Sequence, residues 1–232
     1  MTKKIKGFIF DIDGTLLDSM GIWKTVCSDY LRSIGVEPED GLDGVVSVMS
    51  LHEGCVYSKE HYGLSLSVEE IEKGVIGIIK KFYFKDVLLK DGVYDLVTKL
   101  HEYHIPMVLA TTGNENLAMA ALDRLGIYDC FDGLLTCNAL NTNKKKPDIF
   151  LEAKRLIDSK SLHGSEVSEI CVVEDSLHAL KTAHDAGFFV IGIDNDNDEE
   201  EMNGIKNVSD IVIKNPDTMN IENVGDGVRI TF

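Results

Sequence analysis

The sequence predicts an α/β fold, a doubly wound, Rossmann-like parallel sheet into which a helical lobe is inserted. Short apolar runs at 106–110, 170–173 and 189–193 are separated by segments whose apolar residues recur at helical spacing. Unbroken apolar runs are typical of parallel strands that are buried on both faces. A repeated alternation of strand and helix indicates consecutive βαβ units, which assemble into a doubly wound sheet.

The remaining elements follow from the same patterns. The first strand is expected at 5–10, and helices after the later strands are expected at 116–125, 149–157 and 177–186. The stretch between the first strand and residue 85 has no strong strand pattern and holds helix-like segments at 23–34 and 68–82. We therefore predict a core domain of residues 1–16 and 86–232 and an inserted helical lobe of residues 17–85.

Composition and charge exclude several classes of protein. The chain has 232 residues, of which 44% are hydrophobic and 27% are charged, as in an ordinary globular protein. Its net charge of −16 opposes binding to nucleic acid or to anionic lipid surfaces. No window approaches the roughly twenty apolar residues of a membrane span, and the apolar stretch near the start is too short for a signal peptide. We expect a soluble, cytoplasmic protein.

Four other features favour structural roles. The five cysteines are scattered without a Cys-x-x-Cys pair, and the seven histidines show no metal-ligand spacing, so we expect reduced thiols and no zinc site. The acidic run 194–201 lacks the glycine and glutamate spacing of a calcium-binding EF-hand loop and favours a solvated loop. The large apolar side chain of Trp23 is predicted to pack in the interior of the helical lobe rather than to line a cleft.

Two carboxylates follow the first expected strand. Asp11 and Asp13 are two residues apart, so on an extended chain their side chains point the same way, and Gly14 lets the chain turn sharply afterwards. Such a pair is unfavourable unless a cation lies between the carboxylates or one of them is protonated, and Mg²⁺ is the natural oxygen-ligated cation. The pattern predicts a metal-assisted nucleophile beside an acid/base.

Polar residues also follow the later apolar segments, where open α/β sheets carry their chemistry. Residues with hydroxyl and amide groups follow the strand at 106–110, and an acidic pair follows the strand at 170–173. A cluster of lysines precedes the helix at 149–157. Each has a structural alternative, because hydroxyl and acidic residues cap helices and lysines solvate surfaces. The residues are Thr111, Thr112, Gly113 and Asn114; Lys144, Lys145 and Lys146; and Glu174 and Asp175.

Taken in order, these segments resemble the four motifs of the haloacid dehalogenase-like superfamily. Asp11-Ile12-Asp13-Gly14-Thr15 matches the first motif, Thr111 the second and Glu174-Asp175-Ser176 the fourth. Four matches in order, each beside a separate apolar run, are far less expected by accident than one short motif. The superfamily often carries a helical cap between the first motif and the second strand, as the domain prediction requires.

The third motif leaves one assignment open. If Pro147-Asp148-Ile149-Phe150 sets the register of the usual Lys-Pro-x-Pro-Asp-x-Phe pattern, Lys144 takes the lysine position. Lys145 then replaces the first proline, and Lys146 is a rival.

The resemblance implies a role for each residue. Asp11 attacks phosphorus, Asp13 protonates the leaving oxygen and then activates the acceptor, and Lys144 offsets repulsion from the phosphate. Thr111 binds phosphoryl oxygens, with Thr112, Gly113 and Asn114 contributing at the start of a helix. Asp175, Asp11 and the backbone carbonyl of Asp13 hold Mg²⁺, with Glu174 binding it directly or through water.

The implied activity is that of an Mg²⁺-dependent phosphatase acting on small phosphorylated metabolites, with sugar phosphates favoured. Within the superfamily, the chain resembles the β-phosphoglucomutase-like branch. The mutases of that branch usually carry a histidine where Trp23 stands and an arginine in the cap near 46–48. Neither is present, so hexose-phosphate mutase is the second choice. A non-catalytic, receiver-like metal-binding module is the alternative of a different class. The sequence leaves the oligomeric state open.

Overall fold

The chain folds into two compact units in the computed structural model, which describes residues 2–47, 49–161 and 164–231. One unit comprises Met1–Asp18 and Leu88–Phe232, and we call it the core. The other comprises Ser19–Val87, and we call it the cap. The predicted cap, residues 17–85, is offset by two residues at each boundary.

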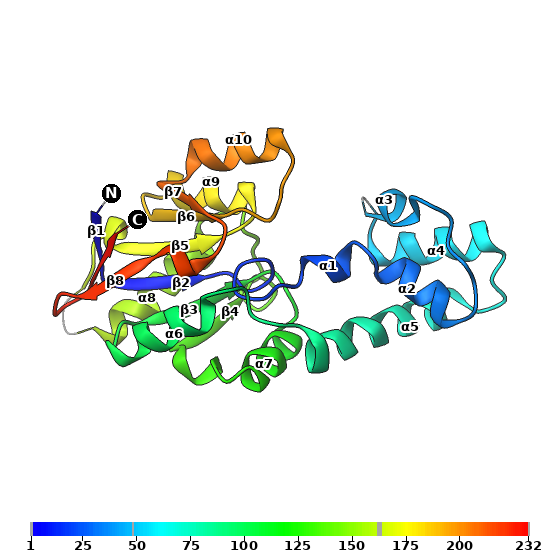
Figure 1. Cartoon of the computed structure of the whole chain (residues 1–232), viewed down its shortest axis with the longest axis horizontal. Coiled ribbons are helices and arrows are strands. Elements are labelled where there is room, and N and C mark those ends of the chain that lie inside the picture. The colour runs from blue at the N-terminus through cyan, green and yellow to red at the C-terminus, as the bar shows by residue number, and fades with distance from the viewer. Residues whose placement is uncertain (1, 48, 162–163, 232) are drawn as a thin grey trace. The chain divides into compact units, whose positions relative to one another are not determined.

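The core contains a six-stranded sheet in the order β4-β3-β2-β5-β6-β7, with every pair parallel (Figure 1). The chain leaves the central strand β2 towards one edge and later returns to the other side of β2, so the sheet is doubly wound as predicted. The strands are β2 (Gly7–Phe10), β3 (Met107–Thr111), β4 (Gly133–Thr136), β5 (Ile170–Glu174), β6 (Phe189–Ile193) and β7 (Ile211–Ile213).

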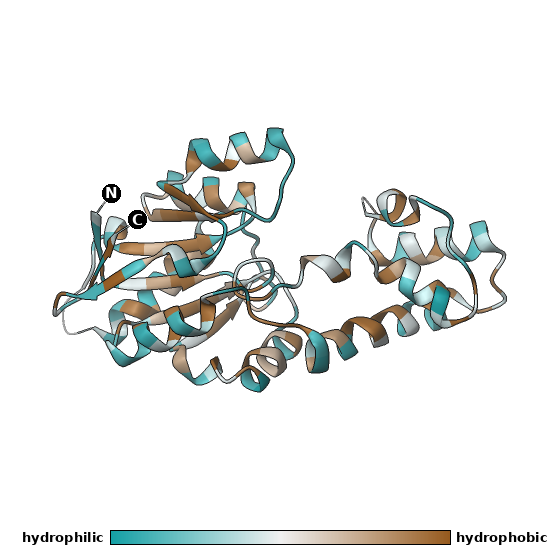
Figure 2. Ribbon diagram, in the orientation of Figure 1, coloured by the Kyte–Doolittle hydropathy of each residue, from teal (hydrophilic) through white to brown (hydrophobic). Residues whose placement is uncertain are grey.

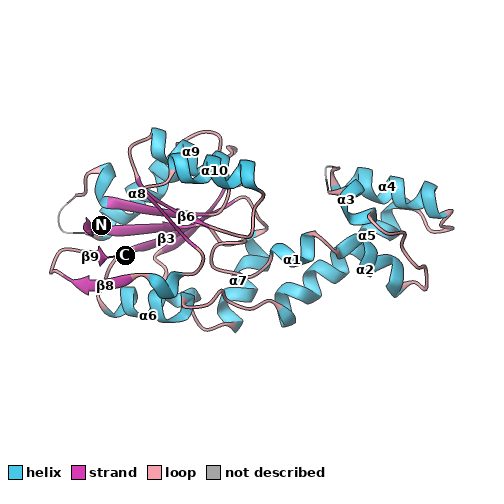
Figure 3. Ribbon diagram, turned by 45° about the horizontal axis from the view of Figure 1, so that its top comes forward, coloured by secondary structure: helices cyan, strands magenta, loops and turns pink. Residues whose placement is uncertain are grey.

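Helices cover both faces of this sheet (Figure 3). α8, α9 and α10 pack on one face, where Ile9, Val108 and Val172 lie in one buried apolar cluster. α6 and α7 lie on the side of the sheet away from α8, α9 and α10. In the central strand β2, Phe8 and Phe10 stack on each other with ring centroids 5.5 Å apart. The helices are α6 (Val93–Glu102), α7 (Glu115–Arg124), α8 (Asp148–Lys160), α9 (Leu177–Asp185) and α10 (Glu199–Val208).

The hydropathy of the residues explains these layers. The core strands are mostly hydrophobic along their length, whereas the helices carry hydrophobic residues on one side and hydrophilic residues on the other (Figure 2). β2, β3, β5 and β6 are buried at every position. Strands enclosed on both faces have no solvent-facing side to alternate with, which is why the sequence pattern identified them.

The first strand differs from the prediction, because the expected run 5–10 is divided at Lys6. β1 (Thr2–Ile5) leaves the parallel sheet and pairs with β9 (Val228–Thr231), which in turn pairs with β8 (Asn220–Asn223) in a second, antiparallel sheet. A Cβ at Gly227 would lie 2.5 Å from the carbonyl oxygen of Ile5. A glycine there lets the C-terminal hairpin approach β1 closely enough to pair.

The acidic run 194–201 also differs from the predicted solvated loop, because its second half begins α10. The side chain of Asp198 accepts a hydrogen bond from the backbone N–H of Glu201 at 2.9 Å and so caps the helix. Three glutamates in the first turn interact favourably with the positive end of the helix dipole.

The cap is helical. Two of its helices begin with capping boxes, formed by Ser50 with Glu53 and by Ser67 with Glu70. The helix expected at 23–34 is two helices, because Thr25 has a φ of −135° outside the helical region. The helices are α1 (Met20–Trp23), α2 (Val26–Ser33), α3 (Leu42–Val46), α4 (Leu51–Tyr62) and α5 (Val68–Lys81), followed by a π-helical turn, η1 (Phe82–Asp86).

None of the helices in the described part of the chain has both the length and the apolar composition that a bilayer crossing requires.

We predict opposite effects of two glycine substitutions in α5. A Cβ at Gly74 would lie 2.2 Å from the buried ring of Tyr30, whereas one at Gly77 would meet nothing within 4 Å. Gly74→Ala should therefore destabilise the cap by about 1–3 kcal/mol through overpacking. Gly77→Ala should stabilise it by about 0.5–1 kcal/mol, since alanine favours the helix. Denaturant unfolding followed by circular dichroism measures both, and equal effects of the two substitutions would contradict the packing of α5 on Tyr30.

Candidate active site

The polar residues that the sequence singled out converge at the carboxyl edge of the core sheet. Asp11 follows β2, Thr111 ends β3, and Glu174 ends β5, with Asp175 directly after it. Because parallel strands share one carboxyl edge, residues separated by more than a hundred positions meet there. Lys144 reaches the same place from the loop between β4 and α8.

Lys144 is the centre of the hydrogen-bond network. Its side chain is 3% exposed, and its Nζ donates to Oδ1 of Asp11 and, at 2.6 Å, to Oε2 of Glu174. The other oxygen of Glu174, Oε1, accepts from the backbone N–H of Ser176 at 3.2 Å. Glu174 thus orients Lys144 towards Asp11 with both of its own oxygens engaged.

Lys145 and Lys146 are both exposed. The lysine that contacts Asp11 is therefore the one that the register of Pro147–Phe150 indicates, and the rival Lys146 lies away from that contact.

Two carboxylates contact this single ammonium group, and a third lies close to both of them. Oxygens of Asp11, Glu174 and Asp175 lie within 4.8 Å of one another. Burial and the neighbouring Glu174 raise the pKa of Asp11 to about 8. Burial and the neighbouring charge of Asp175 raise the pKa of Glu174 to about 7. Burial and the neighbouring charge of Asp11 raise the pKa of Asp175 to about 7. Burial opposes the charge of Lys144, but attraction by Asp11 and Glu174 outweighs it and raises the lysine pKa.

This arrangement fits a divalent cation. When ionised, the three carboxylates exceed Lys144 by two negative charges in a buried position, which is unfavourable without a further positive charge. The side chains of these three residues offer only oxygen ligands, which suit Mg²⁺ or another hard cation. Asp11, Glu174 and Asp175 are thus placed to share one ion.

Asp13 lies beside Thr111 and Gly113. A Cβ at Gly113 would come within 2.8 Å of Oδ2 of Asp13 and 3.2 Å of Oγ1 of Thr111. The absence of a side chain at Gly113 therefore makes room for the Asp13 carboxyl group next to the Thr111 hydroxyl. The backbone N–H of Gly113 itself donates to Oγ1 of Thr111 at 2.9 Å.

The remaining two residues of this segment have different surroundings. Asn114 caps α7 by accepting a hydrogen bond from the backbone N–H of Leu117 at 3.2 Å. Thr112 is exposed. Of the four residues at the end of β3, Thr111 and Gly113 thus lie against Asp13, while Asn114 organises the start of the helix.

Sequence reasoning missed Asn195, which reaches the acidic cluster from the loop after β6. Its side chain hydrogen-bonds to Asp175, to the backbone of Gly14 and to Lys90. One signal was available, because Asn195 follows a buried parallel strand at the same edge of the sheet as the other residues.

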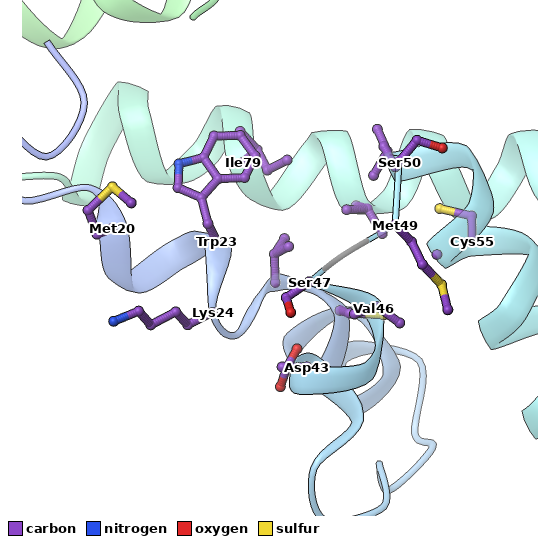
Figure 4. A pocket seen from close by; sticks show the side chains of 15 residues that line it. Met20, Trp23, Lys24, Asp43, Val46, Ser47, Met49, Ser50, Cys55 and Ile79 are labelled. Carbon is purple, nitrogen blue, oxygen red and sulfur yellow. The ribbon is translucent and has the colours of Figure 1, made fainter. Parts of the chain in front are cut away.

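The cap has a cavity of its own, of about 360 Å³ (Figure 4). Its lining is mainly apolar, with Lys24 as its basic residue and Asp43 as its acidic one among the described positions. Trp23 lines this cavity and is 47% exposed, so its predicted burial inside the cap was wrong. Val48, within the stretch where mutases usually carry an arginine, lies outside the described residues.

Comparison with known proteins identifies the family. The sequence profile of the haloacid dehalogenase-like hydrolases matches residues 5–187. The match spans both the core motifs and the inserted cap. The chain therefore belongs to the haloacid dehalogenase-like hydrolase family, as its motifs predicted.

Similar proteins cover most of the chain. Hexitol phosphatase A of Escherichia coli is 25% identical over 205 residues, which are 87% of this chain and 89% of that protein. A phosphoglycolate phosphatase of Rhodobacter capsulatus is 30% identical over 64% of this chain and 69% of its own. A Thermotoga maritima protein assigned as a β-phosphoglucomutase has the same fold, with a TM-score of 0.79, 22% identity and coverage of 92% of this chain and 95% of its own.

We predict that the three adjacent lysines are not equivalent. Lys144→Ala removes the buried ammonium group that contacts Asp11 and should lower turnover at least about 10²-fold. Lys145→Ala and Lys146→Ala alter exposed side chains and should leave turnover within about threefold of wild type. Phosphate release measures the effect, and circular dichroism verifies that each variant is folded. A folded Lys146→Ala protein without activity would show that the register is wrong by two residues.

Proposed function

We propose that this hydrolase cleaves phosphate monoesters of small metabolites through an aspartyl-phosphate formed on Asp11, and that it requires Mg²⁺. The observation that carries the proposal is the group at the carboxyl edge of the sheet, in which Asp11, Lys144 and Glu174 are buried and Asp175 is half-buried. The phosphatases named among its relatives support the same class of reaction.

The first step transfers the phosphoryl group to the protein. A carboxylate oxygen of Asp11 attacks phosphorus, the bond from phosphorus to the ester oxygen breaks, and that oxygen takes a proton from Asp13. We assign the binding of the phosphoryl oxygens to the hydroxyl of Thr111 and the ammonium group of Lys144, which is supported by the contact of Lys144 with Asp11 and by the position of Thr111 near Asp13. Proton transfer by a group such as Asp13 contributes about 10²–10⁴-fold to such reactions.

The second step regenerates Asp11. A water molecule attacks phosphorus and gives its proton to the now ionised Asp13, and the bond from phosphorus to the Asp11 oxygen breaks. Inorganic phosphate leaves, and both aspartates return to their initial states.

We assign Mg²⁺ to Asp11, the backbone carbonyl of Asp13 and Asp175, with Glu174 contributing directly or through water. The bound cation supplies positive charge that screens Asp11 and the phosphate from each other. The crowding of Asp11, Glu174 and Asp175, whose oxygens lie within 4.8 Å of one another, supports this assignment, because it leaves an excess of negative charge that a divalent cation would neutralise.

The substrate class follows from charge and from the relatives. A net charge of −16 disfavours polyanionic nucleic acids, whereas a small phosphate ester needs only the local positive charge of the metal and Lys144. The relatives named for hexitol phosphates and phosphoglycolate favour small phosphorylated metabolites, including sugar phosphates. We assign the choice among them to residues of the cap.

A hexose-phosphate mutase is the second candidate, favoured by the fold shared with the Thermotoga protein. A mutase must bind a second phosphate group and keep water from the aspartyl-phosphate. The described lining of the cap cavity offers Lys24 but no arginine, and the stretch 40–54 contains neither lysine nor arginine. A receiver-like module is disfavoured by the second aspartate, Asp13, and by the family match.

We expect Asp11→Asn to abolish turnover, by at least about 10³-fold, because an amide is neither a good nucleophile nor an equivalent ligand. The fold should persist, since the substitution also removes one of three crowded carboxylates. Phosphate release with and without a divalent cation, together with thermal unfolding, tests both statements. Turnover within threefold of wild type in a folded Asp11→Asn protein would exclude Asp11 as the nucleophile.

We expect hydrolysis to dominate over isomerisation. Incubation with β-glucose 1-phosphate and Mg²⁺ should give little glucose 6-phosphate, because the described lining of the cap cavity offers no arginine to bind a second phosphate group. Both sugar phosphates and free phosphate are followed in one reaction. Isomerisation a hundredfold faster than phosphate release would reject the phosphatase and favour the mutase.

A further inference from the structure

The side-chain amide of Asn195 is fully engaged by three different segments of the core. Its Nδ2 donates to Oδ2 of Asp175 at 2.7 Å and to the backbone carbonyl of Gly14 at 3.0 Å. Its Oδ1 accepts from Nζ of Lys90 at 2.5 Å. The opposite orientation would set an oxygen against two acceptors and an NH₂ group against an ammonium group, so the partners themselves determine how the amide lies.

Lys90 is held at a defined place in this network. It is half-buried, and its backbone N–H donates to the carbonyl oxygen of Leu16 at 2.9 Å. Lys90 belongs to the segment on which the chain re-enters the core after the cap, and Leu16 to the segment on which it leaves. The hydrogen bond from Lys90 to Asn195 therefore connects both crossing segments to Asp175.

The backbone of Gly14 is packed tightly against the same group. Gly14 has a φ of +76°, and a Cβ there would lie 2.2 Å from Oδ2 of Asp175 and 2.8 Å from Nδ2 of Asn195. No side chain fits between the loop after β2 and the loop after β5. Asn195 thus bridges the loop that carries Asp11 and Asp13 to the loop that carries Asp175.

We infer that Asn195, supported by Lys90, is a positioning residue that fixes the carboxylate of Asp175 against the Asp11–Gly14 loop and so sets the affinity of the site for its divalent cation. The inference rests on the proposed metal-dependent function. Asn195 occupies one oxygen of Asp175 and restricts its rotation, which leaves the other oxygen oriented for the cation. Without that hydrogen bond, Asp175 must be ordered when the cation binds, and affinity falls.

The magnitude follows from other metal sites. Loss of a hydrogen-bond partner of a metal ligand typically weakens metal binding by about 10–100-fold. We therefore expect Asn195→Ala to raise the Mg²⁺ dissociation constant by at least about tenfold. At saturating Mg²⁺ the turnover number should stay within about threefold of wild type, because the chemical groups on Asp11 and Asp13 are unchanged. A residue that only stabilised the fold would lower the melting temperature without changing the dissociation constant.

The experiment measures Mg²⁺ binding apart from activity. Melting temperatures are recorded over a series of Mg²⁺ concentrations, and isothermal titration calorimetry gives the dissociation constant directly. The variants are Asn195→Ala, Lys90→Met and the double substitution. If the two residues act as one unit, the double variant should weaken binding little more than Asn195→Ala alone. Lys214→Met is the matched control, because Lys214 pairs at an exposed position with Asp196, the residue next to Asn195 on the same loop.

Each result has a defined meaning. Weakened Mg²⁺ binding in Asn195→Ala and Lys90→Met, with an unchanged control, supports the inference. If Asn195→Ala does not fold, Lys90→Met decides alone, since it leaves the amide in place. Wild-type affinity, within twofold, in a folded variant would overturn the inference while leaving the proposed function standing. Absence of Mg²⁺ binding by the wild-type protein would overturn the proposed metal dependence and the inference with it.

Discussion

The core depends on one electrostatic conflict, in which the carboxylates of Asp11, Glu174 and Asp175 lie together with the single ammonium group of Lys144, and only Asp175 among them is partly exposed. Ionised carboxylates that leave water without full compensation cost several kcal/mol each, so the groups at the ends of β2 and β5 oppose folding in the absence of a cation. The apolar strands behind them supply the opposing stability, since they are buried along their whole length. The burial of the apolar strands therefore offsets the electrostatic cost of holding the carboxylates together. Catalytic groups that are fixed in place before substrate binds need such a scaffold.

Close approach of backbone segments is the second condition for this arrangement. At Gly14 and at Gly113, a side chain would collide with Asp175 or with Asp13. Both glycines follow strands of the parallel sheet and allow adjoining loops to lie nearer than side chains would permit. The result is a compact acidic centre in which small shifts of the backbone change the spacing of charges, and hydrogen bonds such as those of Asn195 restrict such shifts.

Sequence patterns predicted the fold class and the convergence of residues at strand ends because both depend on short-range features. Continuous apolar runs identified β3, β5 and β6 almost to the residue. The register of Pro147–Phe150 favoured Lys144 but left Lys146 as a rival, and it is Lys144 that contacts Asp11. What they missed depends on tertiary contacts. β4 and β7 are too short for a periodic signal, the break at Lys6 follows from pairing with the distant β9, and Asn195 acts through partners far away in the chain. The exposure of Trp23 likewise reflects a cavity that no local pattern encodes.

Trp23 is the single tryptophan of the chain, and it stands half-exposed beside the cap cavity. Indole emission therefore arises from one place, and its wavelength and intensity respond to the polarity and occupancy of that cavity. The core, which carries every proposed catalytic group, contributes no indole signal. The protein thus contains an intrinsic fluorescent probe in one unit alone. A stopped-flow record excited at the indole band would follow changes in the polarity or occupancy of the cap cavity and would not report directly on the chemical step in the core.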